Sequence, residues 1–138
     1  MSDRHDSDIR VSGKPLISVA IPVFNEEANV DNVLVRLAAL SAKMRDVCDF
    51  EFIFSDNCST DETWPKIEKL AKSDDRVKAI RFSKNVGVQR SIYANFLHAR
   101  GDAIVQIDAD LQDPPELIEE FIRLWLAGNM VVYGVRIK

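Results

Sequence analysis

The chain has 138 residues, of which 46% are hydrophobic and 29% are charged, and its formal net charge is −4. This balance is typical of a folded globular domain and excludes a disordered chain, while the negative charge argues against a nucleic-acid-binding protein. Cys48 and Cys58 could pair with each other, but two cysteines and two histidines exclude a disulfide framework and a histidine-rich metal site.

The first 15 residues are polar and mixed in charge, and they contain no apolar stretch of the kind found in a secretory signal. We expect a flexible tail over residues 1–15 and one domain over residues 16–138. No apolar run approaches the roughly 20 residues that cross a membrane. This part of the protein is therefore predicted to be cytoplasmic.

Short apolar runs alternate with helical patterns over the rest of the chain. The apolar runs predict buried strands, and apolar residues spaced three or four apart predict helices. The expected strands span residues 16–21, 50–54, 77–82, 102–107 and 130–135. The expected helices span residues 25–45, 86–100 and 113–128, with a further helix directly after residues 59–62.

Two of the helices carry specific expectations. Ser59 and Glu62 have the spacing of a capping box, which predicts the start of the second helix. In the third helix, Ile92, Phe96 and Ala99 are predicted to share one face.

The alternation of strands and helices predicts an α/β fold with a Rossmann-like, doubly wound and mostly parallel sheet that has helices on both faces. A parallel sheet is normally covered by a helix after its last strand. Because the chain stops just past the fifth expected strand, we expect it to be the first part of a longer protein. The exposed last strand could favour a homodimer.

In open α/β sheets, ligands bind beyond the carboxyl ends of the strands. The segments at residues 22–27, 55–61, 83–87 and 108–113 follow the first four expected strands; all are polar and three are acidic. Carboxylates forced together repel each other unless a cation or a hydrogen-bonding ligand offsets their charge. Mg²⁺ and Mn²⁺ do this with one or two carboxylates and phosphate oxygens, so the sequence favours a metal and phosphate site here.

Asp108 and Asp110 are the sharpest candidates, because alternate residues leaving a strand tend to the same side. Gln112 continues this spacing and could add an oxygen ligand. Such a short motif also arises by chance in an aspartate-rich chain. Asp56, at the tip of the second strand, could accept a hydrogen bond from a base. The acids after Asn25 could equally be favourable first-turn charges of a helix.

Other classes of nucleotide protein lack support in the sequence. No glycine-rich phosphate loop follows the first strand, which disfavours nicotinamide-dependent dehydrogenases and P-loop nucleotidases. A phospho-acceptor signalling domain would need an acidic pair after the first strand, where this chain has Pro22-Val-Phe-Asn25. A non-catalytic nucleotide-binding module remains an alternative.

Taken together, the four strand ends resemble the family 2 glycosyltransferases, which are nucleotide-sugar enzymes of the GT-A fold. The matching stretches are residues 17–26, 55–61, 85–87, 99–102 and 108–116, and they occur in the family's order. The last, Asp108-Ala-Asp-Leu-Gln-Asp-Pro-Pro-Glu116, followed by Val132-Tyr-Gly-Val-Arg136, resembles the polyprenyl-phosphate sugar transferase branch, which includes dolichyl-phosphate mannose synthase.

This resemblance implies roles for individual residues. The expected nucleoside-lining residues are Pro22, Phe24 and Glu26. The expected nucleobase acceptor is Asp56, usually for uracil. The expected metal and diphosphate ligands are Asp108 and Asp110, with Gln112 as a further ligand and Arg136 as a phosphate contact. The departures from the family pattern are Cys58, where Gly or Ala is usual, and Arg90 and Asn95, where small residues are common.

The resemblance also implies an activity. The chain is expected to be the donor half of a glycosyltransferase that moves a sugar from a nucleotide diphosphate, with UDP expected, to polyprenyl phosphate, assisted by Mg²⁺ or Mn²⁺. A saccharide acceptor is the alternative, and no catalytic base is identifiable in the sequence. Membrane contact is expected only through segments after residue 138, with the longer protein at the cytoplasmic face of the inner membrane.

Overall fold

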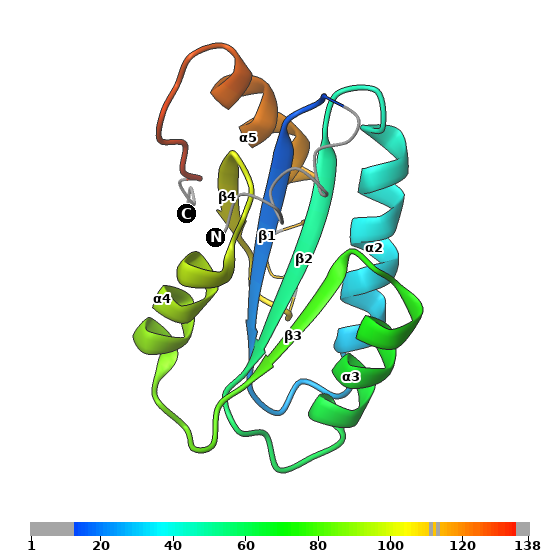
Figure 1. Cartoon of the computed structure of the whole chain (residues 1–138), viewed down its shortest axis with the longest axis vertical. Helices are drawn as coiled ribbons and strands as arrows, with labels where there is room; N and C mark the ends of the chain where they lie inside the picture. The colour runs from blue at the N-terminus through cyan, green and yellow to red at the C-terminus, as the bar shows by residue number, and fades with distance from the viewer. Residues whose placement is uncertain (1–12, 111, 113, 135–138) are drawn as a thin grey trace.

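The structure, a computed structural model, describes residues 13–110, 112 and 114–134, and it forms a parallel sheet flanked by helices on both faces (Figure 1). The strands are β1 (Leu16–Val23), β2 (Asp49–Asp56), β3 (Val77–Arg81) and β4 (Ala103–Gln106). The helices are α2 (Val30–Lys43), α3 (Thr63–Ser73), α4 (Val88–His98) and α5 (Leu117–Leu126). The doubly wound α/β architecture predicted from the sequence is confirmed.

The hydrophobic core lies on one face of the sheet. Alternate residues of a strand point to opposite faces, and the apolar ones of β1 and β2 gather on the face that α2, α3 and α5 cover. The buried strand residues on this face include Ile17, Val19, Ile21, Phe50, Phe52 and Phe54. The buried helix residues that meet them include Val30, Val33, Leu37, Ile67, Ile118 and Ile122. These contacts confirm the apolar stripes predicted for three of the helices.

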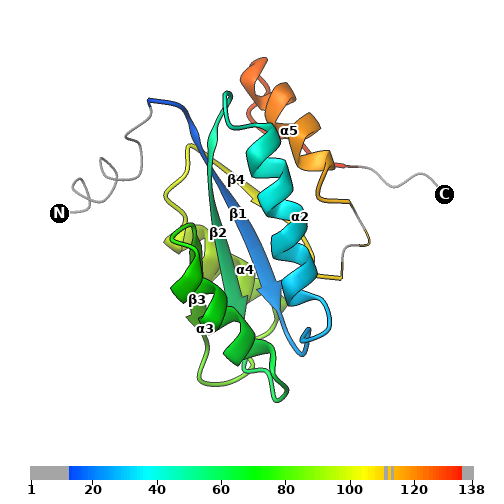
Figure 2. The same ribbon diagram turned by 90° about the vertical axis from the view of Figure 1, so that its right-hand side faces the viewer.

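The other face of the sheet is covered by α4, which packs on β1 and β2. Figure 2 shows α2 and α3 in front of the strands, α5 beside the upper end of α2, and α4 behind the strands. Among the described residues, α4 is the only helix on its side. On the core side, Arg36 and Lys43 of α2 reach Glu116 and Glu119 at the start of α5, each at 2.8 Å, and so hold the two helices together.

The strand order, β3-β2-β1-β4, has a topological switch at β1. The chain moves outward from β1 through β2 to β3, and α4 then carries it back to pair β4 with the other side of β1. The connections therefore leave the carboxyl ends of β1 and β4 in opposite directions. A crevice at such a point is where open α/β sheets bind ligands.

The fifth strand predicted over residues 130–135 is wrong for the part that the structure describes. Residues 130–134 form no strand, and a cavity of about 550 Å³ lies between part of this segment and β4. Without a neighbour at hydrogen-bonding distance, the segment cannot join the ladder. Residue 135 lies outside the described residues.

The start of α3 directly after residues 59–62 is confirmed, whereas α2 and α5 start later than predicted, α5 at Leu117 and not near residue 113. α2 begins at Val30 and not near residue 25, because Asn25 has a positive φ of 52° and the Glu26 carbonyl accepts the N–H groups of Asn29 and Val30 in a turn. The predicted capping box is wrong as well. α3 begins at Thr63, whose N–H donates to Asp61, while the Ser59 hydroxyl donates to a different carboxylate.

None of the helices in the described ranges is long and apolar enough to cross a membrane. Cys48 and Cys58 are both free thiols. Burial raises the pKa of Cys48 to about 11, so this side chain is an uncharged core residue at neutral pH.

Candidate functional site

A cavity of about 240 Å³ lies at the topological switch, where β1 and β4 end. Pro22, Phe24 and Glu26 line it from the end of β1. Asp108 and Asp110 line it from the loop after β4. The structure thus brings together five of the residues that the sequence analysis proposed for a nucleotide and metal site.

Asp108 and Asp110 share this cavity for a different reason from the one that the sequence suggested. β4 ends at Gln106, and Asp110 lies in a turn, so the strand alternation does not extend to these residues. Ala109 between them is buried and packs in the core, which leaves both carboxylates exposed at the cavity. The two carboxylates therefore lie at one cavity, as predicted, but because the residue between them is buried and not because a strand alternates.

The chemistry of these two side chains fits a hard divalent cation. Mg²⁺ is typically held by one or two carboxylates, with phosphate oxygens of the substrate completing its shell. Within the described residues, no group of three or more acidic, histidine or cysteine side chains could hold a metal ion by itself. The arrangement therefore suits a metal that binds together with a diphosphate.

Gln112, the third expected metal ligand, is exposed, and its backbone N–H donates to Asp110 Oδ1 at 3.3 Å. This bond helps to orient the Asp110 carboxylate. Gln112 does not line the cavity, and its role as a ligand stays a prediction. Arg136, the expected phosphate contact, lies outside the described residues.

The loops after β1 and β2 are braced by hydrogen bonds between backbone and side chains. The N–H groups of Asn25 and Glu26 donate to Ser59 Oγ and Thr63 Oγ1, both at 2.8 Å. In return, Asn25 Oδ1 accepts the Thr60 N–H at 2.9 Å. These reciprocal bonds hold the nucleoside-side loop against its neighbour, so several motif residues in both stretches are structural.

Asp61 strengthens the same brace. Its carboxylate accepts the N–H and hydroxyl of Thr63 and, at 3.4 Å, the N–H of Glu27. Burial would raise the pKa of Asp61, but the hydrogen bonds from Thr63 and Glu27 outweigh it and lower the pKa. The carboxylate that the brace requires is therefore ionised throughout the neutral range.

Asp56, the proposed base acceptor, is fully buried and does not line the cavity. Its oxygens accept the N–H and hydroxyl of Ser59, and Arg81 Nε lies 3.6 Å from Oδ2. The Arg81 guanidinium also stacks over the Trp64 ring, 5.5 Å from its centroid. The buried Asp56 carboxylate thus holds the loop in place through Ser59. Its contact with a base stays a prediction.

Five cavity residues were not among the site residues predicted from the sequence: Val23, Asn57, Val88, Ser91 and Ala109. Asn57 Oδ1 accepts the Val86 N–H at 2.8 Å and so ties the β2 loop to the turn before α4. Ser91 Oγ lies 3.0 Å from Ser55 Oγ. The sequence feature that pointed to Val88 and Ser91 was the turn at residues 85–87. Gly87 in this turn has a φ of 88°, and α4 starts directly after it at the same edge of the sheet.

Comparisons with known proteins agree with this site. A sequence model described as glycosyl transferase family 2 matches residues 18–138. The glycosyltransferase YkcC of Bacillus subtilis, whose name marks it as uncharacterized, is 42% identical over 121 residues, which are 88% of this chain and 37% of the relative. A prophage bactoprenol glucosyl transferase homolog of Escherichia coli K12 is 37% identical over 120 residues, 87% of this chain and 39% of the relative.

Solved structures share the fold. The mannosyltransferase PcManGT from Pyrobaculum calidifontis, solved with GDP-Man and Mn²⁺, superposes with a TM-score of 0.70 at 23% identity, over 86% of this chain and 34% of the other. TarS of S. aureus in complex with UDP gives a TM-score of 0.57 at 25% identity, over 75% and 32% of the two chains. These likenesses confirm the GT-A fold.

The chain spans little more than a third of the length of the curated relatives that it matches. Within that span the family match covers β1 through α5 and every loop of the site. The chain therefore belongs to glycosyl transferase family 2.

Proposed function

We propose that this chain forms the nucleotide-sugar-binding part of an enzyme that transfers a sugar from a nucleotide diphosphate to polyprenyl phosphate. The observation that carries the proposal is the cavity at the topological switch, where Asp108 and Asp110 face Pro22, Phe24 and Glu26. Relatives named as bactoprenol glucosyl transferases, at 37% identity, support a polyprenyl phosphate acceptor. The UDP and GDP-Man complexes of similar folds support a nucleotide-sugar donor.

In this proposal the two sides of the cavity have different tasks. The half-exposed Phe24 ring and Pro22 offer apolar surface to a nucleoside. Glu26 is held by Asn29, whose Nδ2 donates to Oε2 at 2.7 Å, so its free oxygen has a fixed position for a ribose hydroxyl. Asp56, although buried behind the Ser59 loop, is proposed to accept from the base.

Asp108 and Asp110 would hold the Mg²⁺ or Mn²⁺ ion, which when bound neutralises charge on the departing diphosphate. A phosphate acceptor is already an anion and needs no base to deprotonate it. The residues of the cavity therefore have, above all, to position the donor and the acceptor. We place the reaction at the cytoplasmic face of the inner membrane, where a polyprenyl phosphate can meet a cytoplasmic nucleotide sugar.

The test is calorimetric titration of the chain with UDP and with GDP, each with and without Mn²⁺. We expect Mn²⁺-dependent binding of one nucleotide, and Asp110→Asn should abolish the dependence on Mn²⁺ without changing the fold, because Asp110 is exposed. Asp75→Asn, at an exposed position on the loop before β3, is the matched control and should bind normally. Mn²⁺-dependent affinity that survives Asp110→Asn would contradict the metal assignment.

A further inference from the structure

The α4 helix has its polar and apolar sides reversed relative to an ordinary surface helix. The side chains that face the sheet are Ser91 and Asn95, both fully buried. The outward side chains Tyr93, Phe96 and Leu97 are between 46% and 66% exposed. The face predicted to carry Ile92 and Phe96 is therefore not the buried one, since Phe96 is 46% exposed.

The reversal has a physical cause in the sheet. The face beneath α4 is partly polar, since Ser18, Glu51 and Ser55 point to it and are buried beside the apolar Ala20 and Ile53. Ser91 meets Ser55 there, whereas the amide of Asn95 has no hydrogen-bond partner among the described residues. The outer side of α4 thus leaves large apolar side chains in water, while polar ones of the same helix are buried. Apolar surface gathered in this way usually marks an interaction site.

The charge around this surface has one sign. From Arg76 to Gly101 the sequence contains no aspartate or glutamate, although the whole chain has a net charge of −4. The basic residues of this stretch are Arg76, Lys78, Arg81, Lys84, Arg90 and Arg100. Arg76, Lys78 and Arg81 pair with acids from other segments. Lys84 and Arg90 are exposed, and within the described part of the chain neither has a hydrogen bond or an ion pair.

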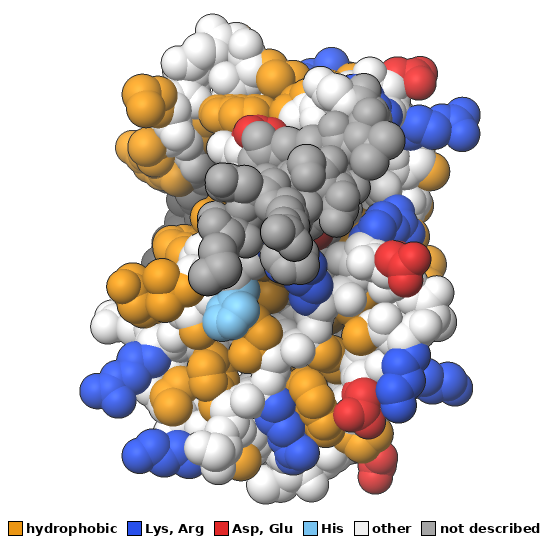
Figure 3. Space-filling view, in the orientation of Figure 1, with side chains coloured by type: hydrophobic (Ala, Val, Ile, Leu, Met, Phe, Trp, Pro, Cys, Tyr) orange, Lys and Arg blue, Asp and Glu red, His pale blue; other side chains and the backbone are white. Residues whose placement is uncertain are grey.

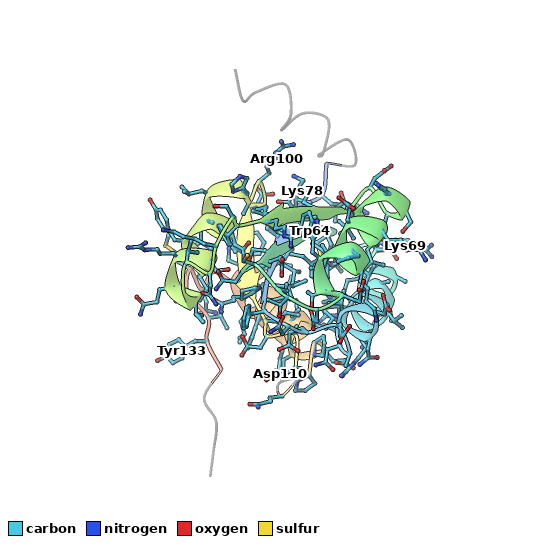
Figure 4. The ribbon with its side chains drawn as sticks, turned by 90° about the horizontal axis from the view of Figure 1, so that it is seen from below. Trp64, Lys69, Lys78, Arg100, Asp110 and Tyr133 are labelled. Atoms are coloured by element: carbon cyan, nitrogen blue, oxygen red, sulfur yellow. The ribbon has the colours of Figure 1, made fainter. Side chains whose placement is uncertain are left out.

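The surface is also convex. α4 stands alone on its side of the sheet (Figures 1 and 4), and both described cavities lie elsewhere, apart from the contact that Val88 and Ser91 make with the nucleotide cavity. Figure 3 shows hydrophobic side chains in the region of α4, with basic side chains at the edge of the molecule beside them and no acidic side chain there. A protruding helix with outward aromatic and aliphatic residues and basic neighbours fits a flat, anionic, partly apolar surface.

We propose that the outer face of α4, formed by Tyr93, Phe96, Leu97 and Arg90 with Lys84 beside it, docks on an anionic phospholipid bilayer. A second copy of the chain fits less well, because two such faces would bring Lys84 and Arg90 together with their own copies. This inference goes beyond the proposed function, since it concerns how the domain meets a membrane and not what its cavity binds.

The test is co-sedimentation of the chain with vesicles of phosphatidylcholine alone and with vesicles that also contain phosphatidylglycerol, without nucleotide or metal. We expect binding only to the anionic vesicles and its loss at high ionic strength, although the net charge of the chain is itself negative. Arg90→Glu should lower the partition constant at least about fivefold. Leu97→Ser should lower it roughly fivefold by removing apolar contact.

Two matched controls come from the other side of the sheet. Lys69→Glu changes the charge equally at an exposed position of α3, and Figure 4 shows Lys69 on the opposite side from α4. Val35→Ser removes an equally exposed apolar side chain from α2. Neither should alter vesicle binding. If Leu97→Ser changes the circular dichroism spectrum, Tyr93→Ser replaces it.

Equal binding to both kinds of vesicle overturns the proposal, and so does an equal loss of binding in the controls. Light scattering on the chain after size-exclusion chromatography tests the other possible occupant of this face, which is a second copy of the chain. A dimer that Leu97→Ser converts to a monomer would show that the face binds a second copy and would also overturn the proposal. Because no nucleotide is present, these outcomes are independent of the proposed transferase function.

Discussion

Lys78 Nζ lies 2.7 Å from Glu51 Oε1, and this ion pair joins β3 to β2 on the polar face of the sheet. The other oxygen, Oε2, accepts the Ser18 hydroxyl and the Arg100 N–H. One carboxylate, almost fully buried, therefore connects three strands with the loop between α4 and β4. Figure 4 shows Lys78 and Arg100 at the margin of the molecule opposite Asp110, so this network is separate from the candidate site.

The Glu51 network predicts a pH-dependent stability. Burial would raise the pKa of Glu51, but the hydrogen bonds from Lys78, Ser18 and the Arg100 backbone, with the charge of Lys78, outweigh it and lower the pKa. An acid with a lowered pKa stabilises the fold above its unfolded pKa of about 4.3. This contribution is lost as the pH falls below that value towards the folded pKa.

Glu51→Gln should accordingly lower the free energy of unfolding by about 1–3 kcal/mol at pH 7, because it leaves a half-buried Lys78 without its partner. The difference between parent and variant should shrink in acid, as the parent carboxylate becomes protonated. Urea unfolding at neutral and acidic pH measures both effects. A difference that is constant across this range would show that the charge of Glu51 is not responsible.

Gly101 is predicted to tolerate no side chain. A Cβ at this position would lie 2.6 Å from Ser18 Oγ and 2.7 Å from both the Leu16 carbonyl oxygen and the Ser18 nitrogen. Two of these three atoms belong to the backbone of β1 and cannot move aside. Gly101→Ala should therefore destabilise the fold by about 3 kcal/mol or more.

Gly134→Ala is the matched control, because its Cβ would meet only the Phe121 ring, at 3.4 Å. Thermal unfolding of the two variants gives the comparison. Ser18→Ala in combination with Gly101→Ala should recover little stability, since the backbone contacts remain. Full recovery in that double variant would place the clash on the Ser18 hydroxyl alone.

The sequence alone could predict the order of the elements and the location of the site. Buried runs such as residues 50–54 and the stripe of α2 have clear periods, and parallel strands must bring their carboxyl ends to one edge. It could not predict the partners of the loops. Ser59 looks like a helix cap locally, yet its hydroxyl bonds Asp56 and accepts from Asn25, 34 residues away. Local sequence preferences contain no information about hydrogen-bond partners that lie so far away in the chain.

The face of α4 was unpredictable for a related reason. Periodicity shows that a helix has two sides, but the side that is buried depends on what the sheet offers. Here the sheet offers Ser55 and Glu51 beside Ile53, and Ser91 turns inward to meet Ser55 while Phe96 turns outward. A rule that apolar residues face inward gives the wrong side whenever the opposite surface is itself polar.

Cys58 occupies a backbone conformation that suits glycine. Its φ is 65°, in the left-handed region, which glycine adopts without strain and a residue with a Cβ does not. Cys58→Gly should raise the free energy of unfolding by up to about 1 kcal/mol, because the relief of left-handed strain exceeds the extra entropy of glycine in the unfolded chain.

Cys58→Ala provides the comparison for that prediction. It removes the thiol and its 3.7 Å contact with the Ser83 carbonyl, but it keeps a Cβ in the left-handed region. Chemical denaturation should rank the glycine variant above both the alanine variant and the parent. If the alanine variant gains as much stability as the glycine variant, the thiol and not the backbone is the source of the strain.

The role of Asp56 can be separated from that of its partner in the loop. Asp56→Ala should weaken UDP binding even without metal, by about 1–3 kcal/mol, if the buried carboxylate accepts from the base. Because the same carboxylate anchors Ser59, the alanine variant also loosens the loop. Ser59→Ala removes the hydroxyl that anchors the loop and bonds the Asn25 N–H but leaves the acid in place.

Calorimetric titration of both variants with UDP distinguishes the two roles. A direct contact predicts a large loss of affinity for Asp56→Ala and a small one for Ser59→Ala, with similar losses of stability on urea unfolding. Equal losses of affinity would mean that Asp56 acts by positioning the loop that carries Asn57, which lines the cavity itself. An Asp56→Ala variant that binds UDP as tightly as the parent would make this aspartate purely structural, and the base would then have to be recognised by Asn57 or by the backbone of the same loop.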